Sequence, residues 1–384
     1  MTVITCIEDL RQLHRKRAPK AFYDYVDAGS YSEGTYRANS DDLAALKLRQ
    51  RVAVDVSRRS TTSTMLGQPV TMPVALAPVG STGMQWADGE ILAARAAEKF
   101  GVPFTLSTMS ICSIEDVAAS TTKPFWFQLY VMRDREFVKR LIGRAKAAKC
   151  SALVLTLDLQ ILGQRHKDLK NGMTVPPRLT LANALDLLTK PAWALRMLGT
   201  KRRSFGNLSG YVRDANGDAS GIVALSRWTA NQFDPTLDWD VVAWVKSEWG
   251  GKLVLKGIQD VDDAKTAVSL GADAIIVSNH GGRQLDGALS SIRALPPIVD
   301  AVGGSVEVWM DGGIRSGQDL FKALALGAKG TLIGRAFSFG LGAMGGPGVT
   351  LALEIIQREL DTTMALCGVR SIAEIGRHLV LNPY

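Results

Sequence analysis

His280 and Arg283 stand three positions apart in a glycine-rich loop, residues 278–286, that directly follows an apolar run at 274–277. Parallel α/β proteins keep their chemistry in loops at the carboxyl ends of strands. An imidazole, with an ordinary pKa of about 6.5, can act as a general base at neutral pH. A guanidinium can bind a carboxylate or a phosphate through two parallel hydrogen bonds. The loop therefore predicts a base beside an anion clamp, with a purely structural histidine as the alternative.

The other histidines are weaker candidates for the base. His14 lies in a run of basic residues and is predicted to sit on a solvated helix, and His378 stands near the end of the sequence. The fourth, His166, lies in a long irregular region. His280 alone follows a predicted buried strand, and the glycines beside it allow backbone and ligand to approach closely.

Two charged residues each end another predicted strand. Asp158 follows the run 152–157 and could orient an imidazole and stabilise its protonated form, although a turn or helix cap is the alternative. Lys256 follows the run 253–255 and could face a developing negative charge. Both residues are candidates for the same site as His280.

Glycines and arginines also follow the last two predicted strands. The sequence Asp-Gly-Gly-Ile-Arg occupies residues 311–315, and Gly334 and Arg335 follow the run 330–333. Glycine turns after the seventh and eighth strands of a barrel commonly bind phosphate. The order of these features along the chain therefore predicts a phosphate site.

These candidates are spaced by alternating strand-like and helix-like segments. The strand-like runs are residues 74–77, 104–106, 125–129, 152–157, 253–255, 274–277, 306–310 and 330–333. Helix-like stretches lie between them, among them residues 90–100, 136–149, 261–270 and 317–326. This alternation predicts an α/β fold, a (β/α)8 TIM barrel, within a single domain spanning residues 1–384. Residues 1–70 are expected to form a helical lead-in and residues 71–384 the barrel.

A long insertion after the fourth strand interrupts the alternation. No clear strand is predicted between Asp158 and Trp239, and the insertion is placed at residues 163–238. Residues 178–205 carry six Lys or Arg against one acid, Asp186, together with several Leu, Trp and Met residues. Such a segment suits anionic lipid headgroups, which predicts peripheral membrane contact. A solvated loop packed on the barrel or on a neighbouring subunit is the alternative.

Composition narrows the function classes. The 384 residues are 46% hydrophobic with a formal net charge of +8, which favours anionic partners. The four cysteines are far apart and suggest free thiols, and we expect no metal site. No signal-peptide core and no run of 18 apolar residues occurs, so a cytoplasmic location is expected. Residues 340–345 spell G-x-G-x-x-G without a βαβ unit, so a nicotinamide-binding domain is rejected. Nucleotide-hydrolysis and nucleic-acid motifs are lacking.

Together the quoted segments resemble the FMN-dependent L-2-hydroxy-acid oxidases and dehydrogenases. The most specific match is residues 278–286, Ser-Asn-His-Gly-Gly-Arg-Gln-Leu-Asp. Similarity extends over nearly the whole chain and includes residues 22–25, 77–80, 127–130, 156–158, 255–257, 311–315 and 363–366. Residues 163–173 and 201–206 are most similar to the membrane-associated bacterial L-lactate dehydrogenases within that family.

The resemblance implies FMN as cofactor and a role for each site residue. His280 would take the substrate proton, and Asp158 would stabilise the imidazolium. Residues that would hold the substrate carboxylate are Arg283, Arg165 and Tyr25, with Tyr130 at the hydroxyl group and Met109 beside the side chain. Residues that would line the flavin ring are Pro78, Val79, Gly80, Ser107, Gln128, Thr156 and Ser278, with Lys256 at the N1–C2 edge. Residues that would hold the ribityl phosphate are Asp311, Gly312, Gly313, Arg315, Gly334 and Arg335.

Two positions bear on the substrate and the electron acceptor. Gly80 replaces an alanine found in many oxidases of this family, which favours a dehydrogenase that reacts poorly with oxygen. Met109 replaces a tryptophan and leaves room for a methyl-sized or somewhat larger group. The expected reaction is therefore L-lactate to pyruvate.

Since the resemblance includes no cytochrome domain, electrons are expected to pass to a respiratory quinone or cytochrome. The expected enzyme is a homo-oligomer, a tetramer or larger, at the inner face of the cell membrane. The alternative is an oxygen-using oxidase of glycolate, mandelate or lactate that makes hydrogen peroxide. Two alternatives belong to other functional classes: an FMN-barrel isomerase of isoprenoid diphosphates and a non-catalytic lipid-binding flavoprotein.

Overall fold

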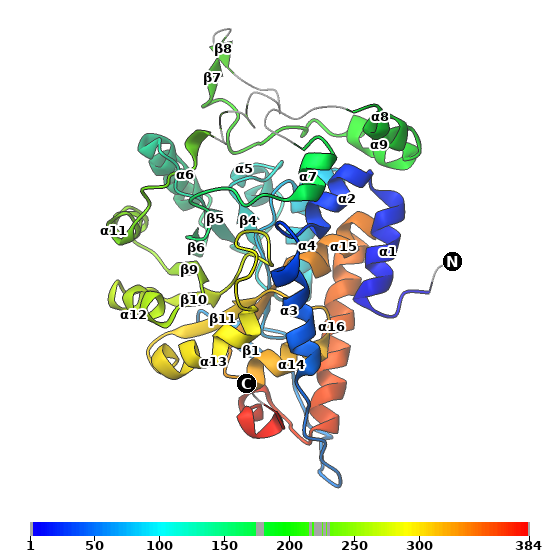
Figure 1. Ribbon diagram of the computed structural model, residues 1–384, viewed down its shortest axis with the longest axis vertical. Helices are drawn as coiled ribbons and strands as arrows, with labels where there is room; N and C mark the ends of the chain where they lie inside the picture. Colours follow the sequence, from blue (N-terminus) through cyan, green and yellow to red (C-terminus); the bar gives the residue numbers. More distant parts are fainter. Residues whose placement is uncertain are drawn as a thin grey trace.

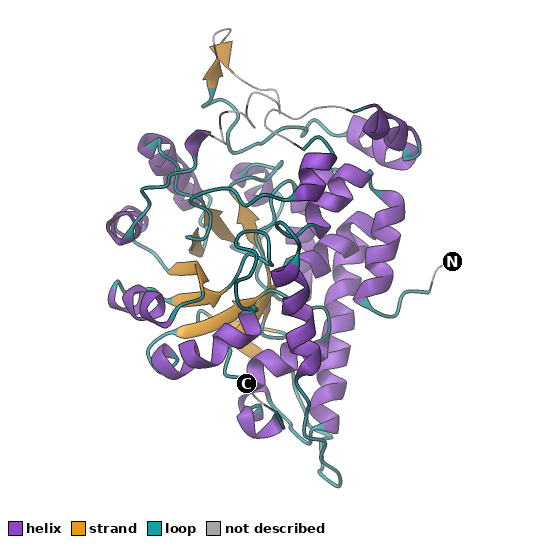
Figure 2. Cartoon of the chain, in the orientation of Figure 1, coloured by secondary structure: helices purple, strands orange, loops and turns teal. Residues whose placement is uncertain are grey.

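The chain folds around eight parallel strands that close into a barrel (Figures 1 and 2). The computed structural model describes residues 3–173, 180–214, 217–218, 225, 228 and 231–382. The strands are hydrogen-bonded in the order β3-β12-β11-β10-β9-β6-β5-β4, and a parallel bridge between Leu76 and Phe104 joins the first to the last. Each strand therefore neighbours the next one along the chain, which confirms the predicted (β/α)8 barrel.

The barrel strands fall on the predicted runs. They are β3 Val74–Leu76, β4 Thr105–Ser107, β5 Trp126–Leu129, β6 Ala152–Thr156, β9 Leu253–Ile258, β10 Ala274–Val277, β11 Glu307–Asp311 and β12 Gly330–Ile333. Nearly every residue of these strands is buried, because helices cover the outside and side chains fill the interior. That double burial explains why the strands appear in the sequence as continuous apolar runs.

Helices alternate with the strands on the outside of the barrel, as Figure 2 shows. They are α4 Gly89–Phe100, α5 Ile114–Ala118, α6 Arg135–Ala147, α11 Trp239–Trp249, α12 Val261–Ser269, α13 Ser291–Val302, α14 Gly317–Ala325, α15 Arg335–Met344 and α16 Gly346–Leu366. Several begin at a serine or aspartate whose side chain accepts a backbone N–H, among them α6 at Asp134 and α14 at Ser316. The four quoted helix predictions are confirmed.

Two stacked tryptophans fill the barrel interior. Trp126 and Trp309 have ring centroids 5.2 Å apart and nearly parallel planes. A hairpin of β1 Ser63–Met65 and β2 Gln68–Val70 packs in the same apolar cluster through Met65 and Leu66. Glu307 Oε2 accepts hydrogen bonds from both the Leu66 N–H and the Trp309 indole N–H, at 3.3 and 3.0 Å. The predicted lead-in is therefore helical only in part, since it ends in this hairpin.

The helical part of the lead-in comprises α1 Ile7–Arg17, α2 Lys20–Asp27 and α3 Gly34–Ala45. The prediction that His14 sits on a solvated helix face is wrong, because its side chain is fully buried between α1 and α15. Its Nε2 lies 2.9 Å from Gln85 Oε1. Burial lowers the pKa of His14 to about 4, against a smaller opposing effect of the hydrogen bond with Gln85. The basic neighbours of His14 occupy other faces of α1.

Helix packing accounts for the G-x-G-x-x-G sequence. Its first five residues lie in α15, and Gly345 ends that helix. A β-carbon at Gly342 would lie 2.0 Å from the His14 ring, and one at Gly340 would lie 2.2 Å from the Gly348 carbonyl oxygen. These glycines let α1 and α16 approach α15 closely.

The insertion contains more regular structure than predicted. It includes α7 His166–Lys170, α8 Leu181–Leu188, α9 Pro191–Gly199 and a short antiparallel pair, β7 Arg213–Asp214 with β8 Gly217–Asp218. The expectation of no strand there is thus wrong in detail, since β7 and β8 pair only with each other outside the barrel. Arg178 of the basic segment lies outside the described residues. In the described ranges no helix combines the length and the apolar character needed to cross a bilayer.

Candidate active site

A pocket of about 270 Å³ brings most of the candidate residues together at the carboxyl end of the barrel. The candidates that line it are Tyr25, Pro78, Val79, Gly80, Ser107, Met109, Tyr130, Arg165, Lys256, His280, Arg283, Asp311, Gly312, Gly313, Arg315, Gly334 and Arg335. They come from the ends of different strands, from the lead-in and, for Arg165, from the insertion. Closure of the barrel is what places residues so distant in sequence around one space.

Four candidates do not line this pocket: Gln128, Thr156 and Ser278, which are buried, and Asp158, which is half-buried. Gln128 Oε1 accepts hydrogen bonds from the Ser107 hydroxyl and the Thr108 N–H. Its Nε2 is buried and has no partner among the described residues. Because a buried amide donor is costly to leave unpaired, this side chain could still serve a bound polar group next to Ser107.

His280 is held from two sides. Its Nδ1 lies 2.8 Å from Asp158 Oδ1, and its backbone N–H donates to the Ser278 hydroxyl oxygen at 3.0 Å. The backbone is left-handed at His280, Gly281 and Gly282, with φ of 57°, 65° and 72°. Such a conformation costs a non-glycine residue about 1–3 kcal/mol and persists only where the surroundings enforce it. The contact with Asp158 leaves Nε2 as the ring nitrogen for a ligand.

Burial keeps His280 neutral, and nearby cations keep Asp158 ionised. Burial lowers the pKa of His280, and nearby Lys256 and Arg283 lower it further, whereas Asp158 opposes them. Burial raises the pKa of Asp158, but Lys256 and, at the acid pH where Asp158 titrates, protonated His280 outweigh it and bring that pKa below its ordinary value. At neutral pH the pair is therefore an imidazole beside a carboxylate, which is the state a general base requires.

Lys256 is a buried cation next to this pair. Its Nζ donates to the Ser278 hydroxyl oxygen at 3.0 Å and lies 3.2 Å from Asp311 Oδ2. Burial lowers the pKa of Lys256, yet the carboxylates of Asp311 and Asp158 raise it above its ordinary value overall. A fixed positive charge therefore faces the pocket, which would stabilise negative charge on a bound group.

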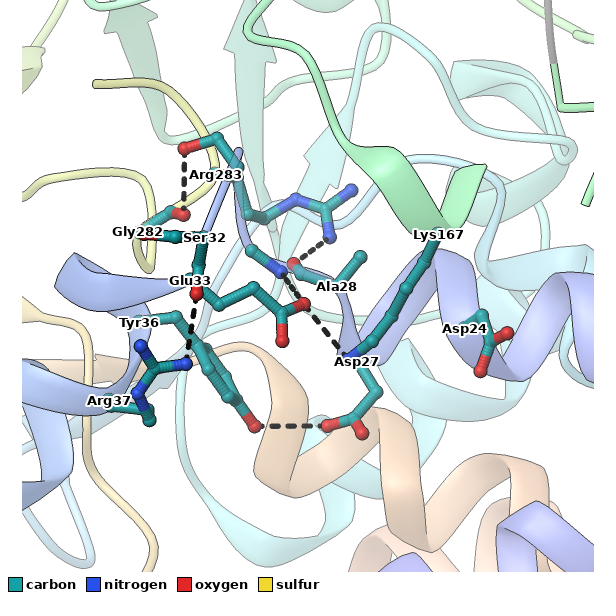
Figure 3. A network of polar contacts seen from close by, with 12 residues as sticks. Asp24, Asp27, Ala28, Ser32, Glu33, Tyr36, Arg37, Lys167, Gly282 and Arg283 are labelled. Carbon is teal, nitrogen blue, oxygen red and sulfur yellow. Dashed lines mark hydrogen bonds and ion pairs between the residues drawn. The ribbon is translucent and has the colours of Figure 1, made fainter. Parts of the chain in front are cut away.

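Arg283 is fixed against the lead-in. Its Nη1 donates to the carbonyl oxygens of Tyr25 and Ala28, at 2.6 and 3.0 Å, and Figure 3 shows the contact with Ala28. Its guanidinium carbon lies 5.0 Å from the centre of the Tyr25 ring. Both hydrogen bonds are donated by the same nitrogen, Nη1. In the described part of the chain no carboxylate pairs with it, so it suits an anionic ligand.

Arg165 approaches the same tyrosine from the insertion. Its guanidinium carbon lies 5.9 Å from the Tyr25 ring, and its Nε lies 2.5 Å from Asp168 Oδ2. The segment that carries it is tied to the lead-in, since Lys167 pairs with Glu33 at 2.9 Å (Figure 3). Two guanidinium groups thus converge at Tyr25. Burial and then the charge of Arg165 lower the pKa of Arg283, and a bound carboxylate would relieve this repulsion.

Tyr130, Met109 and Gly80 occupy the neighbouring wall. Burial and the charge of Asp158 raise the pKa of Tyr130, so its hydroxyl stays protonated and can donate a hydrogen bond. A β-carbon at Gly80 would lie 3.1 Å from the Tyr25 hydroxyl oxygen and 3.2 Å from Met109 Cβ. Any larger residue at position 80 would therefore press on both side chains.

Two half-buried arginines mark the end of the pocket near β11 and β12. Arg315 donates to the Ile314 carbonyl oxygen, and Arg335 donates to the carbonyl oxygens of Val26, Ala28 and Gly281. Burial lowers the pKa of both groups, that of Arg335 to about 9. Among the described residues neither is paired with a carboxylate.

The backbone beside these arginines also suits an anion. Gly312 and Gly313 have φ of 96° and 87°, and Arg335 is the first residue of α15, whose N-terminus is open to an anion. Asp311 Oδ1 is buried without a partner among the described residues, so it could accept a hydrogen bond from a bound group. Cations, glycine backbone and a helix N-terminus together fit a phosphate group attached to a polar chain.

The prediction missed an apolar wall of the pocket. Leu159 and Leu162 follow β6, and Met173, Phe205 and Phe233 come from the insertion. The Phe233 ring lies 6.0 Å from that of Tyr130, edge to face. Met173 and Phe205 stand in segments 163–173 and 201–206, which carry the resemblance, but no role was predicted for them. For Leu159, Leu162 and Phe233 the available signal was their position in or next to an insertion that follows a strand of the site.

Comparisons with known proteins agree with this geometry. Residues 14–382 match the family model described as FMN-dependent dehydrogenase. The chain is 47% identical over 380 residues to an L-lactate dehydrogenase of Caulobacter vibrioides, covering 98% of each protein. It is 46% identical over 381 residues to one of Actinobacillus pleuropneumoniae, covering 99% of each. The solved structure of the monotopic membrane protein (S)-mandelate dehydrogenase superposes with a TM-score of 0.93 at 35% identity, covering 99% of this chain and 100% of that one.

Proposed function

The chain belongs to the FMN-dependent dehydrogenase family, and on this premise we propose that it oxidises L-lactate, an L-2-hydroxy acid, to pyruvate. The observation that carries the proposal is the His280–Asp158 pair, 2.8 Å apart, because its imidazole lines a pocket that also holds two convergent arginines. A 2-hydroxy acid presents a carboxylate and a hydroxyl on adjacent carbons. The pocket offers a clamp for the first and a base for the second.

Substrate binding is assigned to the groups around Tyr25. Arg283 and Arg165 bind the carboxylate, with the Tyr25 hydroxyl beside it, and the protonated Tyr130 donates to the substrate oxygen that becomes the ketone. Holding the carboxylate at two points fixes Cα relative to His280, so substrate binding also orients the reacting atoms. Met109 and the apolar wall then face the substrate side chain.

Two protons and two electrons leave the substrate in the reaction. His280 Nε2 takes up one proton, and the imidazolium that forms is stabilised by the carboxylate of Asp158. FMN, when bound, would accept the two electrons together with the second proton. The proton on His280 is lost to solvent after the product leaves, which returns the imidazole to its neutral state.

The residues present fit FMN. We assign its phosphate to Arg315, Arg335 and the backbone at 311–313, where two half-buried cations lack carboxylate partners in the described chain. The flavin ring is assigned to the strand ends at Pro78, Val79, Gly80, Ser107, Gln128, Thr156 and Ser278. The charge of Lys256 lies beside Ser278 and suits the ring edge that gains negative charge.

Anaerobic mixing tests the reaction directly. We expect the purified yellow protein to lose its flavin absorbance with L-lactate and to keep it with D-lactate. The His280→Gln variant should retain FMN but reduce it at least about 100-fold more slowly, the contribution typical of a general base. Flavin reduction at wild-type speed in this variant would contradict the assignment of the base.

The electron acceptor is inferred to be a membrane quinone or a cytochrome, reached at the inner face of the cell membrane.

Membrane contact is supported by five exposed leucines of α8 and α9: Leu181, Leu185, Leu188, Leu195 and Leu198. Figure 1 shows the two helices projecting beside the lead-in, away from the barrel. Trp193 and Met197 are buried on the opposite side, where the Trp193 indole N–H donates to the Met84 carbonyl oxygen. Helix α9 is thus anchored by one face and exposes the other, whereas no residue of α8 is fully buried.

The oxygen-using oxidase is the competing function of this site. It would return one hydrogen peroxide per lactate, whereas the dehydrogenase would reduce a quinone analogue and make little peroxide. Measuring both products in one reaction separates the two. Gly80 favours the dehydrogenase, in keeping with the resemblance.

A homo-oligomer, a tetramer or larger, is also inferred. Val52 and Leu366 are both exposed, and Arg51 N–H donates to the Leu366 carbonyl oxygen, so the two apolar side chains belong to neighbouring segments. Exposed apolar surface of this kind suits a subunit contact. Sedimentation at equilibrium would return the mass of one chain if this is wrong.

A further inference from the structure

Gln284 connects the loop of the base with the loop of the carboxylate that orients it. Its Nε2 donates to the carbonyl oxygens of Asp158 and Ile161, both at 2.8 Å. Its Oε1 accepts the N–H of Gly163 at 3.2 Å. All three polar positions of one amide therefore bind the backbone of residues 158–163, whereas the side chain itself does not line the pocket.

Close backbone packing accompanies these hydrogen bonds. A β-carbon at Gly163 would lie 2.6 Å from the Arg283 carbonyl oxygen and 2.9 Å from Gln284 Cα. Only glycine allows the two loops to come this near without a shift. The contact between the two loops therefore depends on the side-chain amide of Gln284 and on the absence of a side chain at Gly163.

The segment that Gln284 holds carries two groups of the site. Asp158 begins it and fixes the His280 ring, and Arg165 follows two residues after Gly163. The far end of the segment is held by the lead-in, where the Tyr31 N–H donates to the Gln164 carbonyl oxygen. Gln284 thus holds the end of this segment that lies next to His280.

We propose that Gln284 is a positioning residue that sets the distance of Asp158 from His280 and the approach of Arg165 to the substrate carboxylate. This proposal rests on the proposed function, since it assigns Gln284 a part in that same reaction. The Gln284→Glu substitution keeps the size of the side chain but replaces the two N–H donors by an acceptor. The carboxylate would face two carbonyl oxygens and push residues 158–161 away.

In Gln284→Glu we expect flavin reduction by L-lactate to slow by about 10- to 100-fold, because a displacement near 1 Å can have that effect. KM should rise as Arg165 is displaced, while FMN content stays at the wild-type level. The acid limb of kcat/KM should also move to lower pH, since Asp158 is the group that raises the pKa of His280. A merely destabilised protein would lose thermal stability without this shift.

Two further variants control the interpretation. Gly163→Ala forces the loops apart while leaving Gln284 intact, and it should reproduce both the slower reduction and the shifted acid limb. Gln259→Glu alters a glutamine that donates to the Leu289 carbonyl oxygen, and it should behave as wild type. Wild-type rates, KM and pH limb in Gln284→Glu would overturn the proposal, whatever its melting temperature.

Failure of the proposed function would look different. In that case the wild-type protein itself would not reduce its flavin with any L-2-hydroxy acid. The contact of Gln284 with residues 158–163 can still be tested by amide hydrogen exchange. Residues 158–165 should lose protection in Gln284→Glu and keep it in Gln259→Glu. Unchanged protection would contradict the role of Gln284 independently of the reaction.

Discussion

Asp158 and His280 are 122 positions apart in the chain, yet Oδ1 of the first lies 2.8 Å from Nδ1 of the second. Asp158 follows β6 and His280 follows β10, and β9 stands between these strands in the barrel. Gly257, at the end of β9, makes the contact possible, because a β-carbon there would lie 2.8 Å from Asp158 Cβ. The pair therefore depends on three strands held in register.

Replacing Asp158 with asparagine should slow the proposed reaction and change its pH dependence. The amide preserves the shape but cannot stabilise an imidazolium by charge, so flavin reduction at pH 7.5 should fall about 100-fold or more. In wild type the acid limb of kcat/KM should lie below pH 6.5, because burial lowers the pKa of His280 from that value. The variant's limb should lie lower still, since the carboxylate that opposes this effect is gone.

Stopped-flow reduction between pH 4.5 and 8 measures both quantities. An acid limb at or above pH 6.5 in the wild-type enzyme would contradict the electrostatic description of His280. Glu115→Gln offers a control, because that carboxylate is paired with Arg144 on the outer helices.

His14 should make the fold sensitive to acid. Its pKa is about 4 when folded and 6.5 ordinarily, so the unfolded chain binds the proton more readily. The stabilisation is fully present above pH 6.5 and is lost as pH falls from there toward 4, by about 3 kcal/mol in total. His14→Gln should be less stable at pH 7.5 but should lose less free energy of unfolding on acidification. Equal losses in urea titrations of the two proteins would contradict this.

Arg315 should contribute to FMN binding with little effect on the apoprotein. Its described guanidinium hydrogen bond goes to the adjacent Ile314 carbonyl oxygen, so Arg315→Gln gives up few contacts within the protein. Loss of a charged hydrogen bond to phosphate should weaken FMN affinity about 10- to 100-fold. Flavin fluorescence quenching measures the Kd. The exposed Arg377, paired with Asp300, provides the control Arg377→Gln, which should leave affinity unchanged.

Exposed leucines of α8 and α9 should govern the proposed membrane contact. Replacing Leu185, Leu188, Leu195 and Leu198 with serine removes apolar surface worth roughly 1.5 kcal/mol or more per fully buried leucine. Co-sedimentation with vesicles of phosphatidylglycerol and phosphatidylethanolamine should then be lost, whereas anaerobic flavin reduction by L-lactate stays at the wild-type rate. Leu289→Ser, at another exposed leucine, should still sediment with the vesicles. Retained sedimentation of the fourfold variant would place the contact elsewhere.

In the insertion, residue order alone does not predict which apolar side chains are exposed. Its Leu, Trp and Met residues predicted an apolar segment, but their order alone did not separate exposed from buried side chains until α8 and α9 were placed. Leu185 and Leu188 face outward, whereas Trp193 and Met197 are buried against the barrel and lead-in. Which face is free depends on the packing partner, and the partner lies far away in sequence.

The sequence by itself determined the barrel and the strand ends at which the candidate residues lie. Runs buried on both faces must be apolar throughout, and short glycine loops after them leave few places for a histidine, lysine or arginine. Tertiary structure alone decided that His14 is buried, that Gln284 ties two loops, and that an apolar wall from the insertion faces Tyr130. Those contacts join segments far apart in the chain, where no local periodicity records the distance between side chains.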